Sequence, residues 1–214
     1  MARTLAARGW RVTGTKALPD FRPATGLTPA NLSPFKLLIC NGRYAGPEYH
    51  FSESEVTAIQ DWVKEGGGLL VVGAGAGFGK GQTNPTLNPV LKPFGLEFVD
   101  PPIPNRVVTT RLLHPHSVTE GLSRFSVIWG TAIQGNPEGE VAWINQQPVL
   151  NVLQSGLGRV AAFGGGTAFM GQALNSKIMK ISPSETIRFN TALLLNLARW
   201  LLKEEPGAAN AGHF

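Results

Sequence analysis

The feature that most constrains the fold is a pair of short apolar runs separated by a segment long enough to hold a helix. The runs are "FKLLIC" at residues 35–40 and "LLVV" at residues 69–72. Continuous apolar runs of this length are typical of strands that are buried on both faces of a sheet. A connection that holds a helix lets two such strands pair in parallel. The pattern therefore predicts a strand–helix–strand unit.

The helix within this unit is marked at both ends. Ser52 and Glu55 have the spacing of a capping box, in which each side chain accepts a hydrogen bond from the backbone N–H of the other residue. Gly66 is the expected stop, because glycine adopts the left-handed conformation that ends many helices. An apolar stripe at helical spacing lies between them: Val56, Ile59, Trp62 and Val63. We expect this stripe to pack on the sheet.

The remaining elements are predicted from weaker signals. Residues 2–9 indicate a short helix and residues 10–15 ("WRVTGT") a strand. Asn88, with Pro89 at the first helical position, indicates a short helix that precedes a strand at 96–99. Five further strand candidates follow, at 106–113, 125–133, 140–144, 148–153 and 159–164. Ser182, Pro183 and Glu185 predict a capped final helix, which Pro206 ends.

This order of elements predicts an α/β fold. The first half alternates strands and helices, which favours a doubly wound, mainly parallel sheet with helices on both faces. The second half is rich in strands, so we expect either antiparallel strands added to that sheet or a small appended β layer. The chain has 214 residues, which suits one domain. We expect that domain to span residues 1–203, followed by a flexible tail at 204–214.

Composition limits the classes of partner. The chain has 19 Lys and Arg residues against 14 Asp and Glu residues, and a net charge of +5. A basic balance attracts nucleic acid or anionic lipid, but these cations are dispersed, with no basic run and no interleaved aromatic residues. We therefore expect no nucleic-acid partner. No apolar stretch approaches the length of a membrane span. The N-terminus lacks the apolar core of a secretory signal, which favours the cytoplasm.

Several blocks of the sequence together resemble the class I glutamine amidotransferase-like superfamily. They are "FSESEVTAIQDWVKEGGGLLVVG" at 51–73, "NPVLKPFGLEF" at 88–98, "HPHSVTEGL" at 114–122, "GRVAAFGGGTAF" at 158–169 and "NTALLLNLARWLL" at 190–202. Within the superfamily, the chain is most similar to the non-enzymatic branch. That branch includes the amidotransferase-like domains of gliding-motility and intraflagellar-transport proteins and the accessory domains of enhancin-like metallopeptidases. The resemblance covers about residues 1–203 and implies a flavodoxin-like fold.

The resemblance also implies that the catalytic triad is lost. Active members carry a cysteine on a sharp turn after a strand, where the following helix lowers the pKa of the thiol, and a histidine segment after a late strand. Here Gly75 stands at the place of the cysteine, and the segment Gly164–Thr167 stands at the place of the histidine. We expect no glutaminase activity, no cofactor and no catalytic residue. The expected role is a binding or scaffold module for a protein, small-molecule or carbohydrate ligand.

The glycine-rich loop at 73–81 is a candidate ligand site. It fits neither the phosphate-binding P-loop pattern nor the dinucleotide-binding pattern. Its backbone N–H groups, with Lys80 beside them, would suit an anion-binding nest. The plain alternative is a loop that needs glycine for its turns and for close packing. The candidate ligand-binding residues at strand ends are Arg43, Tyr44, Gly75, Gly77, Lys80, Gly165 and Thr167.

Two further alternatives belong to other classes. A hydrolase or transferase would use Cys40 as its nucleophile, with His50, His114 or His116 as its base. The plain alternative is a buried cysteine, because free cysteines are among the most buried residues. A carbohydrate-binding accessory domain would use the loop after residue 40, where ligands bind in open α/β sheets. His114 and His116 lack further ligands at suitable spacing, so we expect no metal site.

The resemblance implies one more strand than the printed sequence shows. In the family, a buried strand precedes the first helix, whereas residues 2–9 already correspond to that helix. If the position of that strand inside the sheet were empty, two rows of backbone N–H and C=O groups on its neighbours would have no hydrogen-bond partner. We expect a start upstream of Met1, an altered strand order, or a strand from elsewhere. The first of these is favoured, because the first helix would otherwise have little to pack against.

Overall fold

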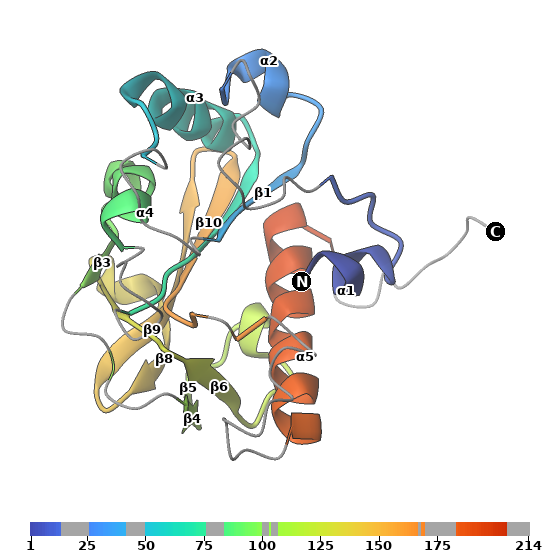
Figure 1. Ribbon diagram of the computed structural model, residues 1–214, viewed down its shortest axis with the longest axis vertical. Helices are drawn as coiled ribbons and strands as arrows, with labels where there is room; N and C mark the ends of the chain where they lie inside the picture. Colours follow the sequence, from blue (N-terminus) through green and yellow to red (C-terminus); the bar gives the residue numbers. More distant parts are fainter. Residues whose placement is uncertain are drawn as a thin grey trace.

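The computed structural model describes residues 1–13, 26–41, 50–75, 84–99, 103, 107–166, 168–169 and 183–204. A six-stranded sheet forms the centre of this part of the chain, in the order β1-β2-β10-β9-β8-β5 (Figure 1). Its strands are β1 Leu37–Asn41, β2 Gly68–Val72, β5 Leu112–Leu113, β8 Glu140–Ile144, β9 Gln147–Ser155 and β10 Gly158–Phe163. Two smaller pairs flank it: β3 Glu97–Val99 with β7 Ala132–Gln134, and β4 Val107–Thr110 with β6 Phe125–Ile128.

Helices cover both faces of the sheet (Figure 1). One face carries α1 Ala2–Ala6 and α5 Pro183–Leu202, and the other carries α3 Glu53–Lys64 and α4 Asn84–Leu91. Alternation along β2 divides the core, because Leu70 and Val72 pack on the α5 side and Leu69 and Val71 on the α3 side. The remaining short helices are α2 Pro29–Leu32, η2 Lys92–Phe94, η3 Ser117–Thr119 and η4 Pro137–Gly139.

The predicted strand–helix–strand unit is confirmed. β1 and β2 pair in parallel, with Ile39 opposite Leu70. The capping box forms as expected: Glu55 N donates to Ser52 Oγ at 3.3 Å, and Ser52 N donates to Glu55 Oε2 at 2.8 Å. Gly66 follows the end of α3 with a φ of +120°, so it is the left-handed stop. β1 is less covered than predicted, because it is the outermost strand on its side of the described sheet.

The expectation of a mainly parallel sheet is wrong. In the described sheet, β1–β2 and β2–β10 are parallel, whereas β10–β9, β9–β8 and β8–β5 are antiparallel. Two tight turns cause this. Asn145 and Gln146, both at positive φ, join β8 to β9, and Gly156, at a φ of +58°, lies between β9 and β10. Such short turns join only antiparallel neighbours. The fold is therefore a mixed α/β fold, in which antiparallel strands of the second half extend the sheet.

Two local predictions are also wrong. Trp10–Thr13 is not a strand, and the last two residues of that predicted strand lie outside the described residues. α4 begins at Asn84 rather than Asn88, so Pro89 lies inside the helix. The sequence has an Asn-Pro pair at each place, and the earlier pair starts the helix. Asn88 instead holds β3, accepting from Phe98 N and donating to Phe98 O, both at 2.9 Å.

The final helix is present as predicted, and its inner face is buried. The buried side chains are Leu193, Leu194, Leu195, Leu197, Ala198 and Leu201. Near its start, Asn190 Oδ1 accepts from Ser126 N, and Asn190 Nδ2 donates to Ser126 O and Ala168 O. Ser182, the predicted cap, lies outside the described residues. Among the helices of the described chain, none is long and apolar enough to cross a membrane.

Candidate functional site

The carboxyl ends of β2 and β10 bring together the two glycine segments that the sequence singled out. Gly75 lies in the connection directly after β2, and Gly164 to Gly166 follow β10 directly, as predicted. The two segments bond to each other, since Gly73 N donates to Phe163 O at 2.9 Å and Gly166 N donates to Gly73 O at 2.8 Å. We call this region the carboxyl edge.

The backbone N–H groups of the carboxyl edge are largely used inside the protein. Gly75 N donates to Trp129 O and Gly164 N donates to Val149 O, both at 2.8 Å. Thr131 N in turn donates to Gly164 O at 3.1 Å. An anion-binding nest needs several N–H groups that point at the ligand. The described part of the loop therefore favours the plain alternative, in which glycine serves close packing.

Two positions show why glycine is required there. A Cβ atom on Gly164 would lie 1.8 Å from Thr131 O, and one on Gly166 would lie 1.9 Å from Ile128 O. Real Cβ atoms do not approach backbone oxygen so closely, so any side chain would force the two segments apart. Gly166 also has a φ of +58°, which glycine adopts without strain. Backbone oxygen atoms therefore leave no room for a side chain at Gly164 or Gly166.

Cys40 is a core residue and not an activated nucleophile. Its side chain packs in the cluster beneath α3 and α4 and is 7% exposed. Burial raises the pKa of the Cys40 thiol to about 12, so the reactive thiolate is not formed near neutral pH. His116 contacts Trp200 on the opposite, α5 side of the sheet. The hypothesis that pairs Cys40 with His116 is therefore wrong, because the sheet lies between them.

His114 and His116 are held by aromatic contacts. The ring of His114 packs edge-on against Trp143 at 4.3 Å between centroids, and the ring of His116 against Trp200 at 5.5 Å. His116 Nδ1 also accepts from Val118 N at 3.1 Å, which caps η3. Burial, and then the nearby Arg159 guanidinium, lowers the pKa of His116 below its usual value. Within the described residues, no group of three or more His, Cys, Asp or Glu side chains is placed to hold a metal ion.

A small buried polar cluster at the start of α4 was missed in the sequence. Asn84 Nδ2 donates to Thr131 Oγ1 at 3.0 Å, and Thr131 Oγ1 donates to Val99 O at 2.8 Å. This chain of donors fixes the orientation of the Asn84 amide. Within the part of the chain that the structure describes, Asn84 Oδ1 and Thr86 Oγ1 are buried and have no hydrogen-bond partner. The Asn-Pro pair at residues 84–85 is the sequence signal for this cluster, and the pair at 88–89 carries the same signal.

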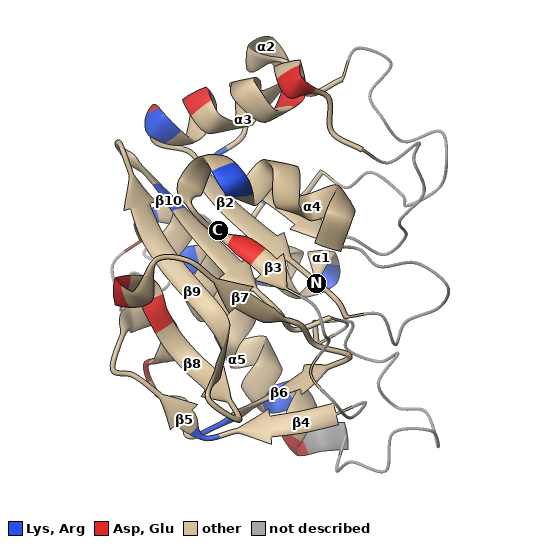
Figure 2. Ribbon diagram, turned by 90° about the vertical axis from the view of Figure 1, so that its left-hand side faces the viewer, with Lys and Arg blue, Asp and Glu red and all other residues tan. Residues whose placement is uncertain are grey.

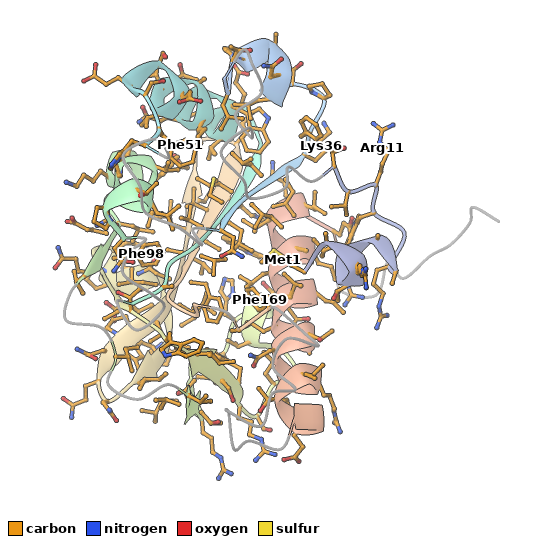
Figure 3. The ribbon with its side chains drawn as sticks, viewed as in Figure 1. Met1, Arg11, Lys36, Phe51, Phe98 and Phe169 are labelled. Carbon is orange, nitrogen blue, oxygen red and sulfur yellow. The ribbon has the colours of Figure 1, made fainter. Side chains whose placement is uncertain are left out.

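The structure brings together only part of the candidate ligand site. Gly75 and Gly165 lie in the two segments of the carboxyl edge, and a Cβ atom on Gly165 would lie 2.0 Å from the Phe163 ring. The other candidates lie outside the described residues: Arg43, Tyr44, Gly77, Lys80 and Thr167. Figure 3 labels Phe98 and Phe169, which belong to the described residues. Met1 N donates to Phe169 O at 3.0 Å. For the five candidates outside the described residues, ligand binding stays a prediction.

Comparison with known proteins places the fold but not the activity. No family model and no curated protein matches the sequence. Among solved structures, the N-terminal domain of mmIFT52 is similar with a TM-score of 0.61 and 16% identity, covering 99% of this chain and 91% of that one. The cytoplasmic protein STM3548 of Salmonella typhimurium is similar with a TM-score of 0.61 and 16% identity, covering 84% and 76%. The chain therefore shares an α/β fold with the mmIFT52 N-terminal domain.

A third similarity is partial. The cold-adapted β-galactosidase of Rahnella sp. R3 matches with a TM-score of 0.51 and 14% identity, and the match covers 79% of this chain but 23% of the enzyme. The shared region is thus a minor part of that enzyme. At this identity the likeness concerns the fold alone.

Proposed function

We propose that this chain is a non-catalytic binding or scaffold module built on a degenerate amidotransferase-like fold. The observation that carries the proposal is the closed carboxyl edge. At Gly164, in the segment where the family holds its base, a Cβ atom would lie 1.8 Å from Thr131 O, and Gly75 and Gly164 donate to carbonyl groups of the protein itself. In α/β sheets this edge is the usual place for a ligand, so a closed one favours recognition elsewhere on the surface.

The fold comparison supports the same role. The likeness to the mmIFT52 N-terminal domain extends over nearly the whole of both chains. The non-enzymatic branch that the sequence resembles includes domains of intraflagellar-transport proteins. We infer that this chain acts by binding a protein partner. The Salmonella neighbour is described as cytoplasmic, and we propose the same compartment here.

The test is an assay of glutamine hydrolysis with a thiol-accessibility measurement beside it. We expect purified protein to release no ammonia from glutamine above the blank, and Cys40→Ser to behave identically. Cys40 should react with a thiol reagent only after denaturation, because its side chain is buried and its pKa is raised to about 12. Ammonia release that is lost in Cys40→Ser would overturn the proposal.

The alternatives have less support. A hydrolase that relies on Cys40 requires a thiolate that burial disfavours. A carbohydrate-binding domain relies on Arg43 and Tyr44, which lie outside the described residues, so it stays a prediction. The assignment of residues 1–203 to one domain also stays a prediction.

A further inference from the structure

The opposite end of the parallel strands has a different character, and we call it the amino edge. It is the end at which β1, β2 and β10 begin. Six cationic residues gather around it, although they are scattered along the sequence: Arg8, Arg11, Lys36, Arg159, Arg199 and Lys203. Figure 3 shows Arg11 and Lys36 at this end of the molecule, where β1 starts.

Hydrogen bonds between distant segments bring these cations together. Trp10 Nε1 donates to Glu204 Oε1 at 2.9 Å, which places Arg8 and Arg11 beside the end of α5. Arg159 Nη1 donates to Trp200 O at 2.6 Å, which joins the start of β10 to the same helix end. Gly68 N donates to Lys36 O at 2.9 Å, at the start of β2.

The turn after α3 completes the amino edge. The Lys203 ammonium lies 3.6 Å from the position that a Cβ atom on Gly66 would take. Leu157, in the turn before β10, donates its N–H to Lys64 O at 2.8 Å and so lies against the same turn. The amino edge is therefore one continuous surface built from five separate parts of the chain.

Two carboxylates of the described residues, Glu65 and Glu204, lie beside the six cations, and Glu204 accepts from Trp10 Nε1. The ion pairs between described residues are Lys64–Asp61, Lys92–Glu97 and Arg124–Glu185, and none includes the six. Acidic ribbon segments in Figure 2 lie on other elements, including α3, β3 and the start of β8, which carry Asp61, Glu97 and Glu140. Among the described residues, cations therefore outnumber carboxylates at the amino edge.

Apolar side chains are exposed on the same edge. Among the described residues, four large hydrophobic side chains are exposed, and three of them lie here: Val12 at 37%, Phe35 at 39% and Leu157 at 69%. The fourth, Leu112, lies in β5 at the far side of the sheet. Exposed apolar groups among unpaired cations are typical of a surface that binds another molecule.

We propose that the amino edge docks an acidic segment of a partner protein, with apolar side chains placed between its carboxylates. The proposal rests on the function proposed above and names the surface that performs it. Carboxylates of the partner complement Arg11, Lys36 and Lys203 and steer the encounter. The apolar residues of the segment cover Val12, Phe35 and Leu157, which removes their exposed area from water.

Features of the edge favour a protein segment over a lipid surface or a nucleic acid. Glu65 is exposed beside Gly66, and Glu204 lies next to Lys203, so a continuous anionic surface would meet fixed carboxylates. A peptide places its carboxylates between such groups. Nucleic acid without a fixed sequence binds by stacking bases on open aromatic faces. Here the ring of Trp200 is covered by the Arg159 guanidinium, 5.2 Å from the ring centroid. Phe35 is the exposed aromatic side chain of the described edge, and a single ring does not stack successive bases.

The test uses a fluorescein-labelled peptide that alternates glutamate and leucine, with fluorescence anisotropy at low ionic strength. Wild-type protein should bind it, and affinity should fall as salt rises. Arg11→Glu combined with Lys203→Glu should weaken binding at least about tenfold, and Leu157→Ser should weaken it severalfold. Arg111→Glu is the matched control, because Arg111 is an exposed cation beside β5 and should not affect binding.

Several results would overturn the docking proposal. Equal affinity of wild-type and the Arg11→Glu, Lys203→Glu variant is one, with circular dichroism showing that both are folded. A second is tight binding to phosphatidylserine vesicles or single-stranded DNA with none to the peptide, which would assign the edge to another class of partner. Glutamine hydrolysis by the wild-type protein would instead contradict the non-catalytic function, and it is measured independently of the peptide.

Discussion

The two ends of the parallel strands differ in the hydrogen bonding of their polar groups and in the exposure of their apolar side chains. At the carboxyl edge, Gly73, Gly75 and Gly164 donate to carbonyl groups of neighbouring segments, and backbone packs against backbone. At the amino edge, cations stand without ion pairs among the described residues, and Leu157 is 69% exposed. One end is thus filled from within the chain, whereas the other presents groups that a partner can satisfy.

This difference matters because α/β folds of this kind usually bind their ligands at one particular end of the strands. Ligands in open α/β sheets bind at the carboxyl ends of the strands because side chains and helix starts converge there. Here backbone oxygen atoms leave no room for side chains at Gly164 and Gly166, while the sheet and its helices remain. Under the function proposed above, the surface for recognition is the amino edge, where the loops enter the strands. The predictions below test the contrast, starting with the largest expected effect.

The strongest test of the closed end is Gly164→Ala. The added Cβ atom would lie 1.8 Å from Thr131 O, so the β10 end and the residue 131 segment must separate. We expect a loss of about 3 kcal/mol or more in the free energy of unfolding, measured by urea denaturation. Gly95→Asn is the control, since nothing lies within 4 Å of its Cβ position and asparagine tolerates its φ of +72°. Similar small losses for both variants would contradict the closed edge.

A matched pair of leucines compares the core with the amino edge. Leu197 on α5 is fully buried, whereas Leu157 is 69% exposed. Leu197→Ala should lower the free energy of unfolding by about 2–5 kcal/mol, because it leaves a cavity. Leu157→Ala should change it by no more than about 0.5 kcal/mol. If Leu157→Ala costs as much as Leu197→Ala, the residue belongs to the core and not to a docking surface.

Much of the fold could be predicted from the sequence, because local signals and burial agree there. The capping box of Ser52 and Glu55, the stop at Gly66 and the runs of β1 and β2 form as their residue types require. Sheet direction was not predictable in the same way. It depends on the turn at Asn145 and Gln146, neither a glycine, where both residues adopt positive φ. Tertiary packing sets that turn more than propensity does.

The two candidate surfaces differ in how far the sequence reveals them. The glycine segments of the carboxyl edge are visible as motifs, but which carbonyls their N–H groups bond is fixed only in space. The amino edge has no local signal at all. Arg8, Lys36, Arg159 and Lys203 are dispersed, and they meet because α5 ends where β1 and β10 begin.

Thr86→Val examines the buried polar cluster at the carboxyl edge. Thr86 Oγ1 is buried with no hydrogen-bond partner among the described residues, and a buried group without a partner costs about 1–3 kcal/mol. Valine keeps the shape of threonine and removes the oxygen, so we expect the variant to be more stable by about 1 kcal/mol in thermal and urea denaturation. A destabilised variant would show that the hydroxyl has a partner.

Acid should weaken the contact between η3 and α5 near the amino edge, with the smallest effect of the series. Burial, and then Arg159, lowers the pKa of His116 in the folded state, and Nδ1 must be unprotonated to accept from Val118 N. The unfolded chain therefore binds the proton more readily, and stability falls as pH drops below about 6.5 toward the folded pKa. His116→Asn should reduce that pH dependence between pH 7.5 and 5.5 in urea denaturation. An unchanged pH dependence would show that His116 does not control it.

Hydrogen exchange with and without the glutamate–leucine peptide tests the central claim most directly, because it reports both edges in one experiment. The account predicts that Gly73, Gly75, Gly164 and Gly166 exchange as slowly as the interior of β2, and that the peptide leaves them unchanged. Segments 8–12, 35–36, 156–159 and 199–203 should gain protection when the peptide binds. Fast exchange at Gly75 and Gly164, or peptide protection at the carboxyl edge instead of the amino edge, would contradict it.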